Sequence, residues 1–244
     1  ARTLPGKLEI PGAEIRTANN DQVGSLSRDE LLRFVRGATI IVTWVSEKVD
    51  AAVLDAAGPS LKAVCNFAVG TDNIDLAACR DRRIVVTNTP NAVTEGTADL
   101  AWALILAVAR RLLPADRFAR GPEYPRRGPL GPVEFVGGDL TGRTLLIVGA
   151  GRIGRAVALR SIGWAMKVLY VSRSLHWDFE LAPLAARRVS LHEGLAEADV
   201  VSIHCPLTPE TRHLIDAAAI AKMKPNALLS NTARGPIVDG SSLV

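Results

Sequence analysis

The sequence predicts an α/β protein with two domains, each built on a parallel sheet. Runs rich in β-branched residues alternate with short helical segments, which is the pattern of strands joined by helical crossovers. A length of 244 residues with 48% hydrophobic content is enough for more than one core. A single long helical segment interrupts the alternation. We therefore expect one domain over residues 1–91 and a second over residues 92–244.

The first domain is expected to be a small parallel sheet covered by helices on both faces. The end of the helix over 51–57 is marked by Gly58 and Pro59, and Asp72 or Asn73 is expected to cap the next helix. A turn follows at 88–91. We expect strands at 38–45, 61–67 and 83–87, and helices at 51–57 and 74–80.

The second domain opens with a helical pattern over residues 94–113. This segment is apolar nearly all round, so we expect it to be buried between domains or against another subunit. Its acidic residues lie early and its arginines late, which suits the helix dipole. After it, we expect strands at 144–148, 167–171, 199–204 and 227–231, and helices at 151–162 and 215–223.

Composition argues against several classes of protein. Charged residues are 22% of the chain and aromatic residues 5%, and no apolar run approaches the roughly 20 residues of a membrane span. There is no leader pattern at Ala1, and the three cysteines form no close pair. We expect a soluble cytoplasmic protein that contacts no membrane. No His, Cys and carboxylate cluster has metal-ligand spacing, so no metal is expected.

The net charge is +4, and six arginines gather between residues 110 and 127. A nucleic-acid patch is one reading of such a cluster. Only Phe118 and Tyr124 accompany the arginines, and Gly and Pro interrupt the stretch from residue 121 to 132. A solvated or subunit-contacting arm therefore fits better, and we expect no nucleic-acid partner.

A glycine motif directly follows the strand expected at 144–148. Gly149, Gly151 and Gly154 form G-x-G-x-x-G, with Arg152 and Ile153 between the second and third glycines. In this strand-to-helix context the first glycine allows a tight turn, the second lets the backbone approach a pyrophosphate, and the third lets the helix pack closely on the strand. These residues predict a dinucleotide site with phosphate at the helix start. The alternative is a tight turn that binds nothing.

The residue that contacts the adenosine ribose should follow the next strand, roughly 20 residues beyond the glycines. Ser172-Arg173-Ser174 stands there, beginning 18 residues after Gly154, and no carboxylate is present to take a ribose 2′-hydroxyl. Arginine offers a fork of donors that matches phosphate. We therefore expect NADP to be preferred, with NAD as the alternative. An ordinary exposed arginine in a loop is the other interpretation.

Four segments of the sequence carry a family resemblance. They are NFAVGTDNID (66–75), DLTGRTLLIVGAGRIG (139–154), ADVVSIHCPLTPET (198–211) and MKPNALLSNTARGPIVD (223–239). They resemble the D-isomer-specific 2-hydroxyacid dehydrogenases, most of all the glyoxylate and hydroxypyruvate reductase branch. The resemblance implies a Rossmann-type cofactor domain and a smaller flavodoxin-like substrate domain, both incomplete, in a homodimer. It also implies reduction of a small 2-oxo acid to the 2-hydroxy acid.

The same resemblance implies roles for individual residues. Arg234 matches the catalytic arginine, which pairs with the substrate carboxylate and polarises the reacting carbonyl. Val69 and Gly70 would offer backbone N–H groups to that carboxylate. Trp44 would line the substrate pocket, although a core tryptophan is as good a reading. Cys205, Pro206 and Thr232 would lie along the cofactor cleft at strand ends.

The resemblance places the general acid, a histidine steadied by a glutamate, beyond the position of Val244. We expect the four histidines present, His176, His192, His204 and His213, to be structural or solvent-exposed. We also expect this chain alone to be slow or inactive, because loss of a positioned acid costs about 10²–10⁴ in rate. At the other end, residues 1–5 resemble the end of the family's first strand.

Two other functions stay open. The chain could be a cofactor-sensing binding protein similar to the corepressors built on this fold, since fold does not fix function. It could also be a dehydrogenase of phosphoglycerate, lactate or phosphite. The basic Ser172-Arg173-Ser174 segment and the 66–75 segment favour the glyoxylate and hydroxypyruvate branch.

Overall fold

The computed structural model describes residues 10–18 and 26–243, and it divides into two compact units. Unit 1 ends at Ala92 and unit 2 begins at Val93. Each unit has its own hydrophobic core, and each is described by itself below. The expectation for residues 1–5 concerns a part of the chain outside the described residues.

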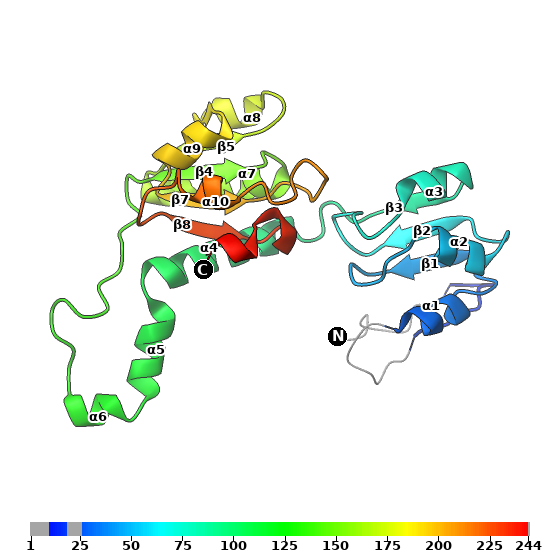
Figure 1. Cartoon of the computed structure of the whole chain (residues 1–244), viewed down its shortest axis with the longest axis horizontal. Helices are drawn as coiled ribbons and strands as arrows, with labels where there is room; N and C mark the ends of the chain where they lie inside the picture. Colours follow the sequence, from blue (N-terminus) through cyan, green and yellow to red (C-terminus); the bar gives the residue numbers. More distant parts are fainter. Residues whose placement is uncertain (1–9, 19–25, 244) are drawn as a thin grey trace. The chain divides into compact units, whose positions relative to one another are not determined.

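Unit 1 contains a parallel sheet in the order β1-β2-β3 (Figure 1). The predicted strands are present but shorter. The helix over 51–57 has the expected bounds. One helix was not predicted, although its start carries a capping box between Ser27 and Glu30. The elements are α1 (Arg28–Phe34), β1 (Ile40–Thr43), α2 (Ala51–Ala57), β2 (Ala63–Asn66), α3 (Leu76–Asp81) and β3 (Val85–Thr87).

Two aspartates start the helices of this unit. Asp50 accepts a hydrogen bond from the Val53 amide at the start of α2. Asp75 does the same for the Ala78 amide at 2.9 Å, so the prediction that Asp72 or Asn73 caps this helix was wrong. The cap lies later because the segment before it bridges to Val49 through Ile74.

Only one face of the unit 1 sheet is covered within the described residues. Ile41 and Val64 are buried in the core formed with the helices. On the opposite face Ile40, Val42 and Val85 are 56%, 59% and 60% exposed. The expectation of helices on both faces was therefore wrong for the part of the chain that the structure describes.

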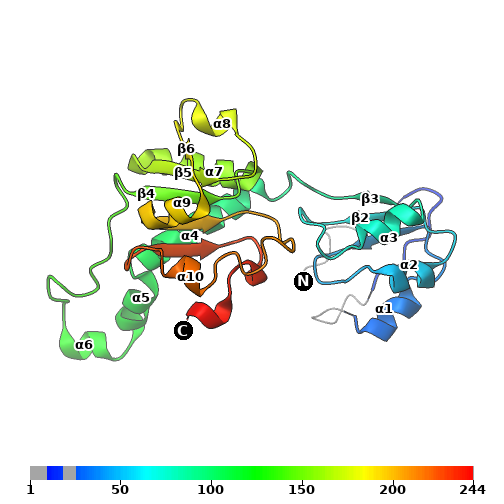
Figure 2. The ribbon, with the colours of Figure 1, turned by 45° about the horizontal axis from the view of Figure 1, so that its top comes forward.

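Unit 2 contains a five-stranded sheet in which every pairing is parallel (Figures 1 and 2). Its order is β6-β5-β4-β7-β8, so the chain starts in the middle, moves to one edge, and then returns to build the other side. Such an order has a switch point between β4 and β7. The strands are β4 (Thr144–Val148), β5 (Lys167–Val171), β6 (Arg187–Arg188), β7 (Val200–Ile203) and β8 (Leu228–Asn231).

Helices cover both faces of this sheet, which is why the β4 sequence TLLIV is almost wholly apolar. On one face Trp102 donates from Nε1 to the Val157 carbonyl at 2.9 Å and stacks on Trp164 with ring centroids 4.4 Å apart. That face carries α4 (Thr94–Ala109), α7 (Arg152–Arg160), η1 (Ser161–Trp164) and α8 (Trp177–Glu180). The other carries α9 (Leu191–Glu197), α10 (Ala217–Ile220) and η2 (Gly235–Ile237), and η3 (Gly240–Leu243) follows.

The single long helix predicted over 94–113 is two helices. The break comes at Arg111, whose φ of 52° is left-handed. After it, α5 (Leu112–Arg120) and α6 (Glu123–Arg127) stand away from the sheet as an arm (Figures 1 and 2). Phe118 holds this arm together through contacts with Tyr124 and Phe135.

Within unit 2, α4 buries only part of its apolar surface, and the expectation that a domain or another subunit covers the rest stays a prediction. Ala98, Ala101, Trp102 and Ile105 are buried on one side of α4, but Leu100, Leu104 and Val108 on another side are exposed. Among the described residues, no helix is long and apolar enough to cross a membrane.

Candidate active site

The glycine loop lies at the switch point of the unit 2 sheet. Gly149 follows β4 directly, and its amide donates to the Val171 carbonyl at the end of β5 at 2.9 Å. On the other side the His204 amide donates to the Val148 carbonyl at 2.8 Å. The loop is thus fixed to the carboxyl ends of both neighbouring strands, where open α/β sheets bind their ligands.

The three glycines of the motif meet three different surroundings. Gly149 has a φ of 105°, and a Cβ there would come within 2.5 Å of the Cys205 amide nitrogen. A Cβ at Gly154 would overlap the Gly149 carbonyl and reach within 2.9 Å of Ile147 Cγ2. A Cβ at Gly151 would meet nothing within 4 Å. The first and third glycines are therefore required by the fold, whereas the described residues give no steric reason for the second.

Gly151 is also the N-cap residue of α7, and no side chain caps this helix. The first N–H groups of a helix have no partner within it, and the dipole adds positive potential. Open space and uncapped donors at the same point fit a phosphate that approaches the backbone closely. Arg152 and Ile153 provide the next two amides.

The predicted ribose-binding segment follows β5. Ser172 is partly buried, whereas Arg173 and Ser174 are exposed. The Ser172 hydroxyl donates to the Ser174 carbonyl. Two charged residues near it were not identified from the sequence. Arg188 donates to backbone carbonyls of the segment, and the positive charge of Arg173 helps to lower the pKa of Glu210, after the larger effect of the hydrogen bond from Thr208.

The ends of β7 and β8 carry the remaining predicted cofactor residues. Cys205 is partly buried, and this burial raises the pKa of its thiol. Pro206 is exposed, and its carbonyl accepts from the Thr211 hydroxyl at 2.6 Å. Thr232 is partly buried, with Oγ1 3.5 Å from His204 Nδ1. All three lie at the same edge of the sheet as Gly149.

His204 is the histidine nearest to these strand ends. Its Nε2 lies 2.8 Å from Ser202 Oγ, and burial lowers the pKa of His204 to about 4. A neutral imidazole therefore lies between β7 and β8. The other three have different surroundings. The His176 and His213 amides donate to Tyr170 Oη and the Pro236 carbonyl, respectively, and His192 is an exposed residue of α9.

Arg234 follows β8 at the start of η2 and is partly buried. Its Nη1 donates to the Ala233 carbonyl at 3.0 Å, and its own carbonyl accepts from Asn231 Nδ2 at 2.8 Å. Asn231 Oδ1 also accepts from the Ala233 amide at 3.0 Å. These bonds from Asn231 determine the backbone path that presents the arginine.

The predicted substrate residues of unit 1 follow β1 and β2. The Val69 carbonyl accepts from Asn88 Nδ2 at 2.8 Å, and the Gly70 carbonyl accepts from Asn66 Nδ2 at 2.7 Å. Both hydrogen bonds use carbonyl oxygens, so neither of them involves the backbone amide of Val69 or Gly70. Trp44 is 51% exposed and lies against Phe67, with ring centroids 5.3 Å apart, so the reading of Trp44 as a core residue was wrong.

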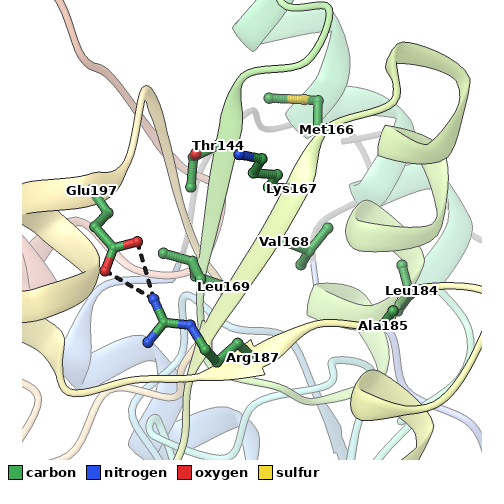
Figure 3. Close-up of a pocket in the computed structure, with 9 residues that line it drawn as sticks. All are labelled: Thr144, Met166, Lys167, Val168, Leu169, Leu184, Ala185, Arg187 and Glu197. Atoms are coloured by element: carbon green, nitrogen blue, oxygen red, sulfur yellow. Dashed lines mark hydrogen bonds and ion pairs between the residues drawn. The ribbon is translucent and has the colours of Figure 1, made fainter.

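A cavity of about 490 Å³ lies elsewhere in unit 2 (Figure 3). It is lined by Thr144 and Lys167, which begin β4 and β5, and by Arg187 and Glu197. Because the amino ends of the strands lie opposite the glycine loop, this cavity is not part of the candidate site. Its charged side chains pair with each other, since Arg187 Nη2 donates to Glu197 Oε1 at 2.9 Å.

No group of three or more His, Cys, Asp and Glu side chains in residues 10–18 and 26–243 could hold a metal ion. The candidate site itself presents backbone amides, hydroxyls and arginines. A doubly wound parallel sheet with a glycine loop at its switch point and an uncapped helix start behind it defines a dinucleotide-binding protein.

Comparisons with known proteins identify the family. Residues 102–244 match the D-isomer specific 2-hydroxyacid dehydrogenase family, NAD binding domain. The chain is 47% identical over 220 residues to the glyoxylate reductase of Thermococcus onnurineus, which covers 90% of this chain and 65% of that protein. The chain belongs to the D-isomer specific 2-hydroxyacid dehydrogenase family, and its NAD(P)-binding part is the region matched.

Solved structures agree in fold. The crystal structure of TT0316 protein from Thermus thermophilus has a TM-score of 0.82 at 44% identity, over 91% of this chain and 68% of that one. D-lactate dehydrogenase from Aquifex aeolicus, complexed with NAD and lactic acid, has a TM-score of 0.78 at 32% identity, over 89% and 62%. The chain thus spans about 65% of the length of the curated relatives it matches.

Proposed function

We propose that the protein is an NAD(P)-dependent oxidoreductase that interconverts a small 2-oxo acid, glyoxylate or hydroxypyruvate, and the corresponding 2-hydroxy acid. The observation that carries the proposal is Gly151, where the chain leaves open space beside an uncapped helix start at the switch point of the sheet. Relatives named glyoxylate reductase support the choice of substrate.

In this proposal the unit from Val93 onward binds the cofactor and the unit ending at Ala92 binds the substrate. Gly149, Gly151 and Gly154, with the amides of Arg152 and Ile153, hold the pyrophosphate. Cys205, Pro206 and Thr232 form the wall of the cleft along the ends of β7 and β8. Their backbone positions are expected to matter more than their side chains.

We further propose that NADP is preferred over NAD. Ser172, Arg173 and Ser174 supply hydroxyls and a guanidinium where a carboxylate would select the ribose 2′-hydroxyl. Glu210 opposes this preference, since its carboxylate is close enough to Arg173 for the arginine to lower its pKa. The preference for NADP over NAD is therefore expected to be incomplete, so that the protein still binds NAD.

Arg234 is assigned the central chemical role. Its guanidinium pairs with the carboxylate of the 2-oxo acid and draws electron density from the reacting carbonyl as charge develops on the oxygen. By the resemblance, Val69 and Gly70 of unit 1 would offer backbone N–H groups to a substrate carboxylate, and Trp44 an exposed apolar wall. The reduced nicotinamide, when bound, supplies the hydride. The resemblance assigns the proton donor to a histidine later in the family's sequence than Arg234.

Two experiments test this function. Titration of the chain with NADPH and NADH, followed by nicotinamide fluorescence, measures cofactor binding, and failure to bind either would contradict the proposal. Oxidation of NADPH on addition of glyoxylate or hydroxypyruvate, measured on the complete gene product, tests hydride transfer. An Arg234→Lys variant should keep cofactor affinity but lose most of this turnover.

By the resemblance, we also propose that the cofactor-binding units pair in a homodimer. The exposed row of Leu100, Leu104 and Val108 on α4 is an apolar surface that a second copy could cover by the same row, as a two-fold interface requires. Sedimentation velocity should show a dimer, and Leu104→Glu should shift the chain toward the monomer. A monomeric chain at all concentrations would contradict the assignment.

A further inference from the structure

A short edge strand brings an arginine to the segment that follows β5. The strand is β6, only Arg187–Arg188, and it pairs with β5 so that Arg188 lies opposite Tyr170. From there Arg188 reaches past the end of β5. Its Nε and Nη2 donate to the Ser172 carbonyl at 3.2 and 2.9 Å, and Nη2 also donates to the Arg173 carbonyl at 2.8 Å.

These three hydrogen bonds fix two successive peptide groups in the ribose-binding segment. A planar guanidinium that donates to adjacent carbonyls restrains both peptide planes more than a single ammonium could. The Ser172 hydroxyl, which donates to the Ser174 carbonyl, continues the same restraint along the backbone. Arg188 therefore helps to determine where the side chains of Arg173 and Ser174 are presented.

Side-chain contacts also hold the chain that follows this segment, up to residue 180. Tyr170 Oη donates to Glu180 Oε1 at 2.7 Å and accepts from the His176 amide at 3.1 Å. Arg155 of α7 forms an ion pair with Asp178 of α8 at 3.1 Å. Arg188 thus completes a set of anchors around residues 172–180, and it is the anchor at the residues closest to the end of β5.

Arg188 and the neighbouring Arg187 have different hydrogen-bond partners. Arg187 donates to carboxylates, with Nη1 2.5 Å from Glu193 Oε1 and Nη2 2.9 Å from Glu197 Oε1. The hydrogen bonds of Arg188 described above go to carbonyls, which accept them without cancelling the charge. Its positive charge remains to act beside Arg173, where a ligand phosphate carrying about −1.5 to −2 charges would be attracted.

We propose that Arg188 is a positioning residue that favours the 2′-phosphate of NADPH, because it fixes the 172–174 backbone and adds positive charge to it. This inference rests on the proposed cofactor binding. It concerns the adenosine end of the cofactor, far from the reacting carbonyl, so its effect is expected in binding of the nucleotide and in the ratio of NADPH to NADH affinity.

The test compares four proteins: the unaltered chain, Arg188→Met, Arg188→Lys and Arg187→Met. Each is titrated with NADPH and NADH by nicotinamide fluorescence, and with adenosine 2′,5′-bisphosphate and 5′-AMP by calorimetry. Arg188→Met should weaken NADPH and the bisphosphate about tenfold, because a positive charge beside Arg173 and the hold on the 172–174 backbone are both lost. NADH and 5′-AMP should change about twofold or less. Arg188→Lys should fall between, because it keeps the charge and loses the fork.

Arg187→Met is the matched control, since it removes an exposed arginine from the same strand without removing a contact to residues 172–174. It should leave the NADPH to NADH ratio unchanged. Thermal unfolding of each variant, without nucleotide, checks that the fold is kept. Equal weakening of both nucleotides by Arg188→Met would reduce Arg188 to a general support of the loop and overturn the inference.

The outcomes also separate this inference from the proposed function. If the unaltered chain binds neither NADPH nor NADH, the cofactor proposal fails and this inference fails with it. If the chain binds both and Arg188→Met or Arg188→Lys leaves their ratio unchanged, the cofactor proposal stands and the role of Arg188 is refuted. A larger shift in ratio for Arg187→Met than for Arg188→Met would refute it as well.

Discussion

Alanine substitution at Gly151 should separate cofactor binding from folding. A Cβ at this position meets no protein atom within 4 Å, and the backbone φ of −87° is ordinary for alanine. As an N-cap, alanine is less favourable than glycine, which costs on the order of 0.5 kcal/mol. The free energy of unfolding should therefore change little. In the same loop, Gly154→Ala places a Cβ against the Gly149 carbonyl and should cost about 1–3 kcal/mol.

The effect on binding should be the reverse. The added methyl group occupies the space through which a phosphate would reach the amides at the start of α7. Loss of two hydrogen bonds to a charged group, at about 1.5 kcal/mol each, amounts to about 3 kcal/mol, or more than a hundredfold in Kd. NADPH titration by fluorescence and urea unfolding, done on the same preparations, measure both quantities. Gly151→Ala protein that binds NADPH as tightly as the unaltered chain would refute the assignment of this glycine.

Three further substitutions test other parts of the site. Glu210→Gln removes the carboxylate that Arg173 affects, so NADPH should bind about two- to threefold more tightly and NADH should change less. Arg234→Lys should reduce turnover of the complete gene product about a hundredfold or more, because an ammonium cannot pair through a fork with the substrate carboxylate. His204 has a folded-state pKa of about 4 against 6.5 in the unfolded chain, so between these values the unfolded chain binds a proton that the folded chain does not. The free energy of unfolding should therefore decrease as the pH is lowered through that window, and it should be about 2 kcal/mol smaller at pH 5 than at pH 8. His204→Asn should lack that part of the decrease.

Each of these has an outcome that contradicts it. Weaker NADPH binding by Glu210→Gln would mean that the carboxylate supports the nucleotide. Full turnover by Arg234→Lys would remove the arginine from the chemistry. A His204→Asn protein whose urea midpoint decreases between pH 8 and pH 5 as much as that of the unaltered chain would show that the buried imidazole is not the source. Carboxyl groups with a lowered pKa, such as Asp199, affect stability mainly below this pH window, and they do so equally in the unaltered chain and in His204→Asn.

Features carried by a short stretch of sequence were predicted well. The strands at 144–148 and 167–171 and the helix at 51–57 have the bounds expected from sequence, because their apolar runs are local signals. The glycine loop was found for the same reason. Family membership followed from the motifs and is confirmed by the match over residues 102–244.

Features that depend on neighbours distant in sequence were missed. Arg188 lies 14 or more residues from the segment that it holds, and a two-residue edge strand gives no periodic signal. Glu210 comes near enough for the charge of Arg173 to affect its pKa only once β5 and β7 are neighbours of β4. The break at Arg111 requires a left-handed residue that is not glycine, which no propensity predicts. By contrast, the helix at Leu191–Glu197 was missed despite a local signal, the Ser190 cap that accepts from the Glu193 amide.

Hydrogen exchange with and without NADPH tests the central claim most directly, because it reports which backbone amides the nucleotide contacts. The account predicts new protection at residues 149–155 after β4, at 172–174 after β5, and at 204–205 and 232–234 after β7 and β8. The amino ends of the strands, including the cavity at Thr144 and Lys167, should be unchanged. Protection absent from the glycine loop, or confined to that cavity, would contradict the account.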